Sequence, residues 1–460
     1  MTAPVVPELR RDLGTWSAIA IVVGTVIGSG IFLVPKAMIL RVGTPEMVFA
    51  VWVFGGVLSL FGALTYAELS AALPEAGGEY VYLREAYGPF WGFLYGWTQT
   101  WVAKSASIAT LATAFYLYLA NFFPALDTVL LHFDTPLGPG GGPFEIRNGQ
   151  LLAMAVILCL AGLNSLGVRF GGAVQVTVTA LKVAAILGIV AVGLLSGHGS
   201  ASNFNTSVPA PGGFTGFFAA LVAALWAYDG WNNVSMVASE IRRPQRNLPL
   251  ALIGGTLAVM AVYLATNLAY FYVLPASAVA GADRVAAEMM RRVSGAAGAS
   301  VVSAAAVISI FAALNGSILS GSRVPYALAR DGVFFPSWAR VHPVRQTPAT
   351  AVIFLSIWSA VLVLSGQYEQ LYTLVIFPSW ILYAMTAAAV IVLRRKRPDL
   401  ARPYKTIGYP VVPVIFVAVS AMLLVSTLIA SPRESALGLF VIAAGLPFYR
   451  HWSRKYSQFR

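Results

Sequence analysis

The stretch GTVIGSGIF at residues 24–32 decides the fold. It lies in the middle of the first long apolar run, from about residue 15 to about residue 38. Glycine inside a helix costs about 1 kcal/mol relative to alanine. Non-helical backbone inside a membrane persists only where it is buried in protein or lines a cavity. The stretch therefore predicts a broken membrane helix whose unwound centre faces a cavity, although small residues also allow a close contact between two intact helices.

The composition is that of a protein that crosses a membrane many times. Of its 460 residues, 58% are hydrophobic and only 10% are charged, whereas soluble domains carry about 25% charged residues. We expect an all-α membrane protein with about twelve transmembrane helices, judged by the length of about 20 residues that a helix needs to span the bilayer. The predicted segments are 15–38, 46–72, 90–123, 149–166, 170–196, 214–239, 248–274, 299–322, 348–365, 370–393, 410–430 and 434–449. A short amphipathic helix is also expected at 286–293, in an external loop.

The net charge of +12 has its explanation in the membrane topology. Cytoplasmic loops of membrane proteins are enriched in lysine and arginine. With both termini inside, about 20 of the 30 basic residues fall in cytoplasmic segments, so we expect a multi-pass protein of the cell (inner) membrane with cytoplasmic tails at 1–14 and 451–460. The lipid bilayer rather than nucleic acid is the expected partner of this charge.

Other chemistries lack the residues that they need. The chain has a single cysteine, Cys159, which excludes a disulfide framework within one chain and a cysteine-based metal site. The four histidines have no metal-ligand spacing, and there is no phosphate-binding Gly-x-x-x-x-Gly-Lys-[Ser/Thr] loop. We therefore expect no metal, no cofactor and no enzymatic activity.

A second interruption, WAYDGWNN at residues 226–233, lies in the sixth apolar segment. Asp229 is an ionisable group at membrane depth, which costs about 2.5–3.5 kcal/mol, so its default interpretation is functional rather than a structural cap. Interrupted helices at corresponding positions of two halves are typical of transporters with inverted repeats. The predicted organisation is a first repeat at 15–197, a second at 198–395, and two further helices at 396–450.

Such breaks suit an α-amino acid, which carries both a carboxylate and an ammonium group. Free N–H groups at the start of a half-helix attract the carboxylate, and free carbonyl groups at the end of a half-helix attract the ammonium group. We expect Ser29 and Gly30 to offer donors. The expected acceptors are the carbonyl groups near Val26, Trp226 and Ala227, with the carboxylate of Asp229. Trp226 is large enough to close over the substrate, although a packing or interfacial tryptophan is the ordinary interpretation.

Two lysines also lie inside apolar segments. Lys182 is about 12 residues into its run, which places it near mid-membrane. It is either a fixed cation that bonds to the broken first helix or a proton carrier, and the absence of an acid in its own helix favours the fixed cation. Lys104 either faces the vestibule or stabilises the bundle through hydrogen bonds.

The remaining polar groups receive more ordinary interpretations. We expect Glu68 and Glu79 to be solvated or interfacial, and Glu240 to join a cytoplasmic charge network with its neighbours Arg242 and Arg243. The patch Asn315-Gly316-Ser317 is expected to pack between helices.

Four motifs together resemble one family. GSGIF at 28–32, AEL at 67–69 with PEAGGEY at 74–80, WAYDGWN at 226–232, and EIRRPQRNLP at 240–249 resemble the amino acid–polyamine–organocation (APC) superfamily, in its L-type amino acid transporter branch of bacterial type. The resemblance covers about residues 10–450. It implies a LeuT-type fold of five plus five helices, with helices 1 and 6 broken, and sodium-independent exchange of neutral L-amino acids by alternating access.

The resemblance also implies site residues. The site for the substrate backbone maps onto Val26, Gly28, Ser29, Gly30 and Ile31, and onto Trp226, Ala227, Asp229 and Gly230. The gating aromatic residue falls on Trp226, and the lysine at the vacated sodium position falls on Lys182.

Asp229 departs from the family pattern, in which glycine is common at this position. An acid here would suit a proton-coupled amino acid or polyamine symporter, which is the alternative to exchange. A transport-inactive amino-acid sensor is the alternative of another class. The predicted external loop at 124–147 has no cysteine, so no disulfide-linked heavy subunit is expected.

Overall fold

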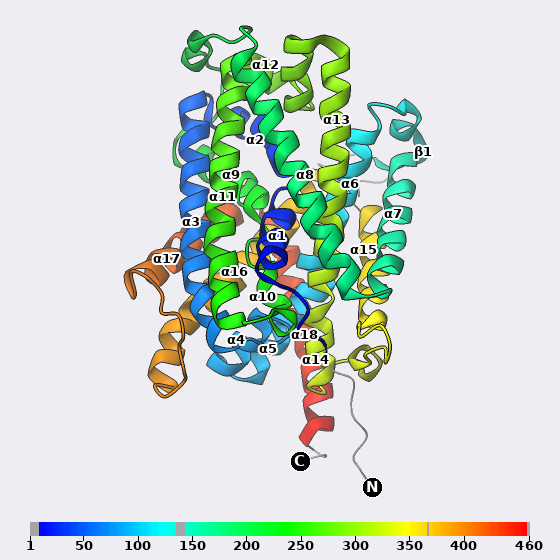
Figure 1. The fold of residues 1–460 in the computed structure, drawn as a ribbon, viewed down its shortest axis with the longest axis vertical. Coiled ribbons are helices and arrows are strands. Elements are labelled where there is room, and N and C mark those ends of the chain that lie inside the picture. Colours follow the sequence, from blue (N-terminus) through cyan, green and yellow to red (C-terminus); the bar gives the residue numbers. More distant parts are fainter. Residues whose placement is uncertain (1–8, 135–142, 366–367, 458–460) are drawn as a thin grey trace.

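The computed structural model describes residues 9–134, 143–365 and 368–457 as a bundle of helices (Figure 1). The first half contains α1 (Thr15–Val26), α2 (Gly30–Val42), α3 (Pro45–Ala72), α4 (Glu79–Tyr87), α5 (Pro89–Thr98), α6 (Lys104–Leu119), α7 (Asn148–Ser165) and α8 (Val168–Leu195). A π-helical turn, η1 (Gln99–Ala103), joins α5 to α6. The hairpin of β1 (Val129–Phe133) and β2 (Phe144–Arg147) is the one sheet in the described part of the chain.

The second half and the last two long helices are also helical throughout their long elements. They comprise α9 (Gly213–Tyr228), α10 (Asn233–Met236), α11 (Pro244–Val273), α12 (Ala276–Gly281), α13 (Val285–Gly321), α14 (Arg323–Arg330), α15 (Ala349–Val363), α16 (Tyr368–Lys396), α17 (Val411–Ala430) and α18 (Pro432–Ser457). Non-helical dihedral angles at Ser294 and Gly295 separate the start of α13 from its long part, which places a short helix at the predicted amphipathic segment.

The helices are apolar enough for a membrane protein. In the described residues, nine helical stretches have the length and hydropathy to span a bilayer, and two shorter apolar helices, α9 and α15, accompany them. The expectation of an all-α membrane protein is confirmed, whereas this count does not establish twelve spans. Helix α9 is too short to be counted as a full span because it ends at the predicted break. Of the predicted tails, residues 1–8 and 458–460 lie outside the described part.

The first and sixth segments are both broken. Helix α1 ends at Val26 and α2 begins at Gly30, while α9 ends at Tyr228 and α10 begins at Asn233. Gly230 has a φ of +102°, which favours glycine, and an added Cβ would lie 3.0 Å from the hydroxyl of Thr25. The two breaks therefore pack directly on each other at the centre of the bundle.

A short backbone link joins the same two segments at one end of the bundle. Leu13 and Ile241 form a parallel bridge, in which Leu13 N donates to Glu240 O at 3.0 Å and Arg242 N donates to Leu13 O at 2.8 Å. The start of α1 and the end of α18 point to this end, at the bottom of Figure 1, where α4, α10 and α14 also lie. Helix α12 and the far end of α2 lie at the opposite end, which we call the outer end, and we call the end with α4 and α14 the inner end.

The closest approach of the two broken segments depends on Gly30. A Cβ at this position would lie 2.5 Å from Cα of Ala227, which is closer than atoms pack, and backbone cannot move aside as a flexible side chain can. Gly30→Ala should therefore destabilise the protein by about 1–3 kcal/mol, measured as a lower melting temperature of the purified protein in detergent. Gly254→Ala in α11, where an added Cβ meets nothing within 4 Å, is the matched control. Equal melting temperatures for the two variants would contradict this packing.

Candidate functional site

The two breaks line a small central cavity together with residues of α6 and α13. Its lining residues are Thr25, Val26, Gly28, Ser29, Gly30, Ser107, Leu111, Trp226, Asp229, Gly230, Asn233 and Ser317. The cavity has a volume of about 10 Å³, which is about the space of one water molecule. An amino acid cannot enter this arrangement unless helices move, so the structure is a closed state.

Seven of the nine residues predicted to bind substrate line this cavity. The two others do not. Ile31 is fully buried in the core, one residue beyond the start of α2, and Ala227 packs its Cα and Cβ against Gly30. The side chain of Ala227 is thus used for the contact between the half-helices, and only its backbone is close to the break.

Lys182 reaches the first break from α8. Its Nζ donates to Gly24 O at 2.5 Å and to Ile27 O at 2.6 Å, and the side chain is buried. The hydroxyl of Ser309 in α13 also donates to Ile27 O, at 3.2 Å. These donors satisfy carbonyl groups that the end of α1 leaves without helical partners.

Tyr263 in α11 holds the two breaks together, and sequence reasoning missed it. Its hydroxyl lies 2.8 Å from Val26 O and 2.8 Å from Ala227 O. Thr25 adds a contact between the breaks, because its hydroxyl lies 3.1 Å from Gly230 O while it also bonds to Ile21 O of its own helix at 2.7 Å. In the sequence Tyr263 is one aromatic residue in a long apolar segment, and no local signal distinguishes it.

The outer side of the cavity is closed by a chain of three side chains. Trp226 Nε1 donates to the hydroxyl of Tyr368 at 2.8 Å, and this hydroxyl donates to Ser29 Oγ at 2.9 Å. The ring of Tyr372 stacks on Trp226 with 6.0 Å between centroids. Both tyrosines belong to α16, so the tenth predicted segment joins the two broken helices over the site. Sequence reasoning missed both of them.

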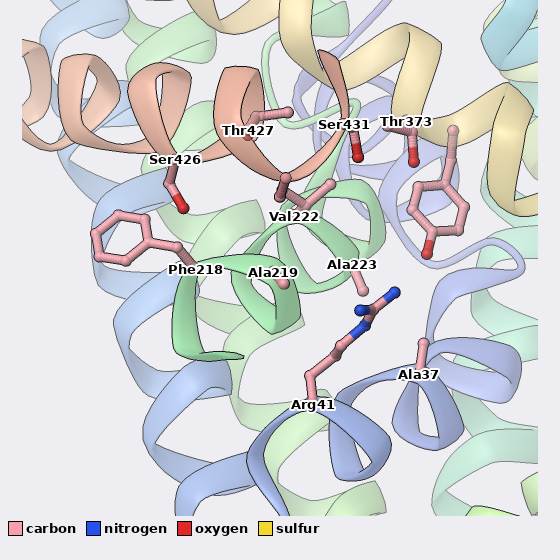
Figure 2. Close-up of a pocket in the computed structure, with 12 residues that line it drawn as sticks. Ala37, Arg41, Phe218, Ala219, Val222, Ala223, Thr373, Ser426, Thr427 and Ser431 are labelled. Carbon is pink, nitrogen blue, oxygen red and sulfur yellow. The ribbon is translucent and has the colours of Figure 1, made fainter. Parts of the chain in front are cut away.

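A second cavity lies beyond this closure, between α2, α9, α16 and α17, and has a volume of about 80 Å³. Figure 2 shows the side chain of Arg41 reaching from α2 toward α9, with hydroxyl groups of Ser426, Ser431 and Thr373 on the opposite wall. Val222, one turn before Trp226 in α9, lines it. None of the described residues lines both cavities, and the stacked rings of Tyr372 and Trp226 lie between them.

The inner side of the cavity is closed by charged groups. Tyr383 in α16 donates to Asp229 Oδ1 at 3.0 Å, and Lys104 Nζ donates to Asn233 Oδ1 at 2.7 Å. Lys104 is close enough to interact electrostatically with Asp229 and with Glu79. Lys104 is therefore a buried hydrogen-bonding group at the broken sixth segment.

The expectation that Glu68 and Glu79 are solvated or interfacial acids is wrong. Glu79 has no exposed surface and accepts hydrogen bonds from Tyr95 and Asn232. Glu68 is 2% exposed and accepts from Arg394 at 2.7 Å. Their polar neighbours in the sequence suggested water, but the fold places other helices over both carboxylates.

The expectation for Glu240 is also wrong. Glu240 is fully buried and pairs with Arg323 at 2.8 Å, rather than with the arginines that follow it in the sequence. Asn315 agrees with the packing interpretation, because it accepts a hydrogen bond from Asn164 of α7 at 2.7 Å. Ser317, two residues after Asn315 in the same helix, instead lines the central cavity.

The outer end carries one ion pair that ties α2 to the α12–α13 loop. Lys36 Nζ donates to Asp283 Oδ1 at 2.6 Å. This hydrogen bond, together with the positive charge of Lys36, lowers the pKa of the Asp283 carboxyl. In the described residues no three histidine, cysteine or acidic side chains come together as a metal-binding group would require.

Comparison with known proteins agrees with this geometry. The family model described as "Amino acid permease" matches residues 13–447. The serine/threonine exchanger SteT of Bacillus subtilis is 34% identical over 447 residues, which cover 96% of each chain. The human b(0,+)-type amino acid transporter 1 is 34% identical over 450 residues, covering 97% of this chain and 88% of the relative. The mouse Asc-type amino acid transporter 1 is 30% identical over 96% of this chain and 81% of its own.

The paired breaks, the buried lysine that bonds to the first of them and the match over nearly the whole sequence lead to one conclusion. The chain belongs to the amino acid permease family, within the APC superfamily.

Proposed function

We propose that this protein is a sodium-independent exchanger of neutral L-amino acids that works by alternating access. One observation carries the proposal: the Nζ of Lys182 bonds to both Gly24 O and Ile27 O at the end of α1. A protein cation already binds these carbonyl groups, so the site does not need a sodium ion to hold the first break. Relatives named as an exchanger and as amino acid transporters support the same function.

The backbone groups at the two breaks suit a zwitterion, although Val26 O is bonded to Tyr263 in this closed state. The start of α2 at Ser29 and Gly30 would bind the carboxylate, because the N-terminus of a helix attracts anions. The carbonyl groups near Val26 and Trp226 would accept the ammonium group. We propose Trp226 as the aromatic gate, since it is joined through Tyr368 to Ser29.

The buried charges around the cavity favour a substrate with a neutral side chain. Two basic side chains, Lys182 and Lys104, and two acidic ones, Asp229 and Glu79, surround the cavity. A neutral amino acid, with one charge of each sign, leaves this balance unchanged. The proton-coupled alternative would use Asp229 or Lys182 as the titrating group, and the sensor alternative would bind substrate without moving it.

We further propose the membrane arrangement implied by the charge pattern. Both termini are cytoplasmic, the protein lies in the cell membrane, and residues 15–197 and 198–395 form the two inverted repeats. The end of the bundle with α4, α10 and α14 is then the cytoplasmic end. Cys159, the single cysteine, lies in α7 rather than in the loop at 124–147, so we expect no disulfide-linked heavy subunit.

Uptake of labelled neutral amino acids into proteoliposomes in sodium-free buffer, at equal pH on both sides, tests the exchange. We expect uptake only when the lumen contains unlabelled amino acid. Uptake into empty liposomes that increases with an imposed proton gradient would contradict exchange and support symport. Binding of substrate without uptake under either condition would support the sensor.

Lys182→Ala should abolish exchange. The substitution leaves Gly24 O without its buried partner and removes one of the two donors to Ile27 O. The measurement is the initial rate of exchange, beside the melting temperature, which should fall only modestly. Lys36→Ala, which removes a lysine from the outer end of the first segment, is the control. A wild-type exchange rate in Lys182→Ala would refute the role of the fixed cation.

Trp226→Ala should raise the apparent KM and speed the release of bound substrate, because the outer closure loses both its hydrogen bond to Tyr368 and its stacking on Tyr372. The effect on melting temperature should be smaller than the effect on binding. Trp16→Ala, at a side chain that is 75% exposed, is the matched control. If Trp226→Ala bound and exchanged substrate like the control, Trp226 would not be the gate.

A further inference from the structure

The turn Gly77-Gly78-Glu79, just before α4, presses against the short helix α10. Gly77 N donates to Met236 O at 2.9 Å. Gly77 and Gly78 have φ angles of +103° and +54°, which favour glycine. A Cβ on Gly78 would lie 2.7 Å from Ser235 Oγ and 3.0 Å from Met236 N. Only glycine therefore lets this backbone approach α10 so closely.

The side chain of Glu79 holds the same helix by its polar groups. Its carboxylate accepts hydrogen bonds from Tyr95 at 2.9 Å and from Asn232. The hydroxyl of Ser235 lies 3.5 Å from the carboxylate and donates to Asn232 O at 2.7 Å. Asn232 is the last residue of the sixth break, and Ser235 lies inside α10. Glu79 therefore links the turn to the residue directly before α10.

Helix α10 has little to hold it in place by itself. It is four residues long, with the break before it and a 3₁₀ turn after it. A helix this short is not stable alone. Its position depends on its contacts, and one residue of it, Asn233, lines the central cavity and binds Lys104. A displacement of α10 would therefore open the inner side of the cavity.

The surroundings of Glu79 contain groups that can exchange partners. The titratable or charged side chains that interact with it from other elements are Tyr66 of α3, Tyr95 of α5, Lys104 of α6 and Tyr383 of α16, and Tyr82 does so from its own helix. Glu79 is therefore surrounded by hydroxyl, amide and ammonium groups, and these can form new hydrogen bonds when its present ones break.

We propose that Glu79 is a positioning residue that latches α10 in the closed state, and that the cytoplasmic side of the site opens when its bond to Asn232, the residue directly before α10, breaks. The inference rests on the proposed function for the direction of opening. Glu79 does not touch the central cavity, and it acts through α10. Its loss should shift the protein toward the state that is open to the cytoplasm.

Accessibility of a cysteine in the cavity tests the latch without measuring transport. The background is Cys159→Ser with Ser317→Cys, and the probe is a membrane-impermeant thiol reagent added to one side of proteoliposomes of known orientation. With Glu79→Gln, we expect labelling several-fold faster from the cytoplasmic side and slower from the outer side. Glu75→Gln is the matched control, since Glu75 lies in the same connection but pairs at the surface with Arg84 and Arg330. Equal labelling rates in both variants would overturn the proposal.

Exchanging the side chains of Glu79 and Asn232 distinguishes the loss of this contact from a general loss of folding. Asn232→Asp alone places two carboxylates together and should give fast cytoplasmic labelling. Adding Glu79→Gln to it restores one acid facing one amide, and should return labelling to within about twofold of the background. A double variant that labels as fast as either single variant would overturn the proposal. Because labelling requires no substrate movement, a protein that failed to exchange amino acids would disprove the proposed function and leave this result readable.

Discussion

The structure depends on one constraint, which is that two membrane segments stop being helical at the centre of the bundle and their backbone groups still need partners. In lipid, each unsatisfied group costs several kcal/mol. The partners come from segments distant in the sequence: Lys182 and Ser309 bond to the first break, and Tyr263 bonds to both. The breaks also contact each other through Thr25. The irregular backbone is therefore stable only as part of the whole bundle, and its exposed remainder is available to a ligand.

Closure on each side of the cavity uses a different kind of interaction. The outer side is closed by aromatic rings and hydroxyl groups around Trp226, which can separate without leaving a charge unpaired. The inner side is closed by carboxylates and their partners, including the fully buried pair of Glu240 and Arg323. Breaking a buried pair by losing one partner costs about 3–5 kcal/mol, while the pair itself adds little net stability. The charged groups of the inner closure must therefore find new partners, protein or water, when it opens.

The sequence was informative where a polar or helix-breaking residue lies inside an apolar segment. Glycines and an aspartate inside apolar runs located both breaks, and a lysine at mid-membrane identified Lys182. It was uninformative where the partner lies on another helix, as for Tyr263 and Tyr368, because a tyrosine in an apolar segment looks ordinary. It was misleading for Glu79 and Glu240. Their polar neighbours suggested water or nearby arginines, whereas burial depends on which helices cover them, and local sequence does not contain that information.

The parallel bridge between Leu13 and Ile241 links the start of the first segment to the stretch that follows α10. Two hydrogen bonds join the two stretches through their backbones, so the link does not depend on which side chains they carry. We expect the half-helix that carries Val26 and the one that carries Asn233 to move as one unit, so that this side of the cavity opens in one step rather than two. Leu13, just ahead of α1, would then move with both of them.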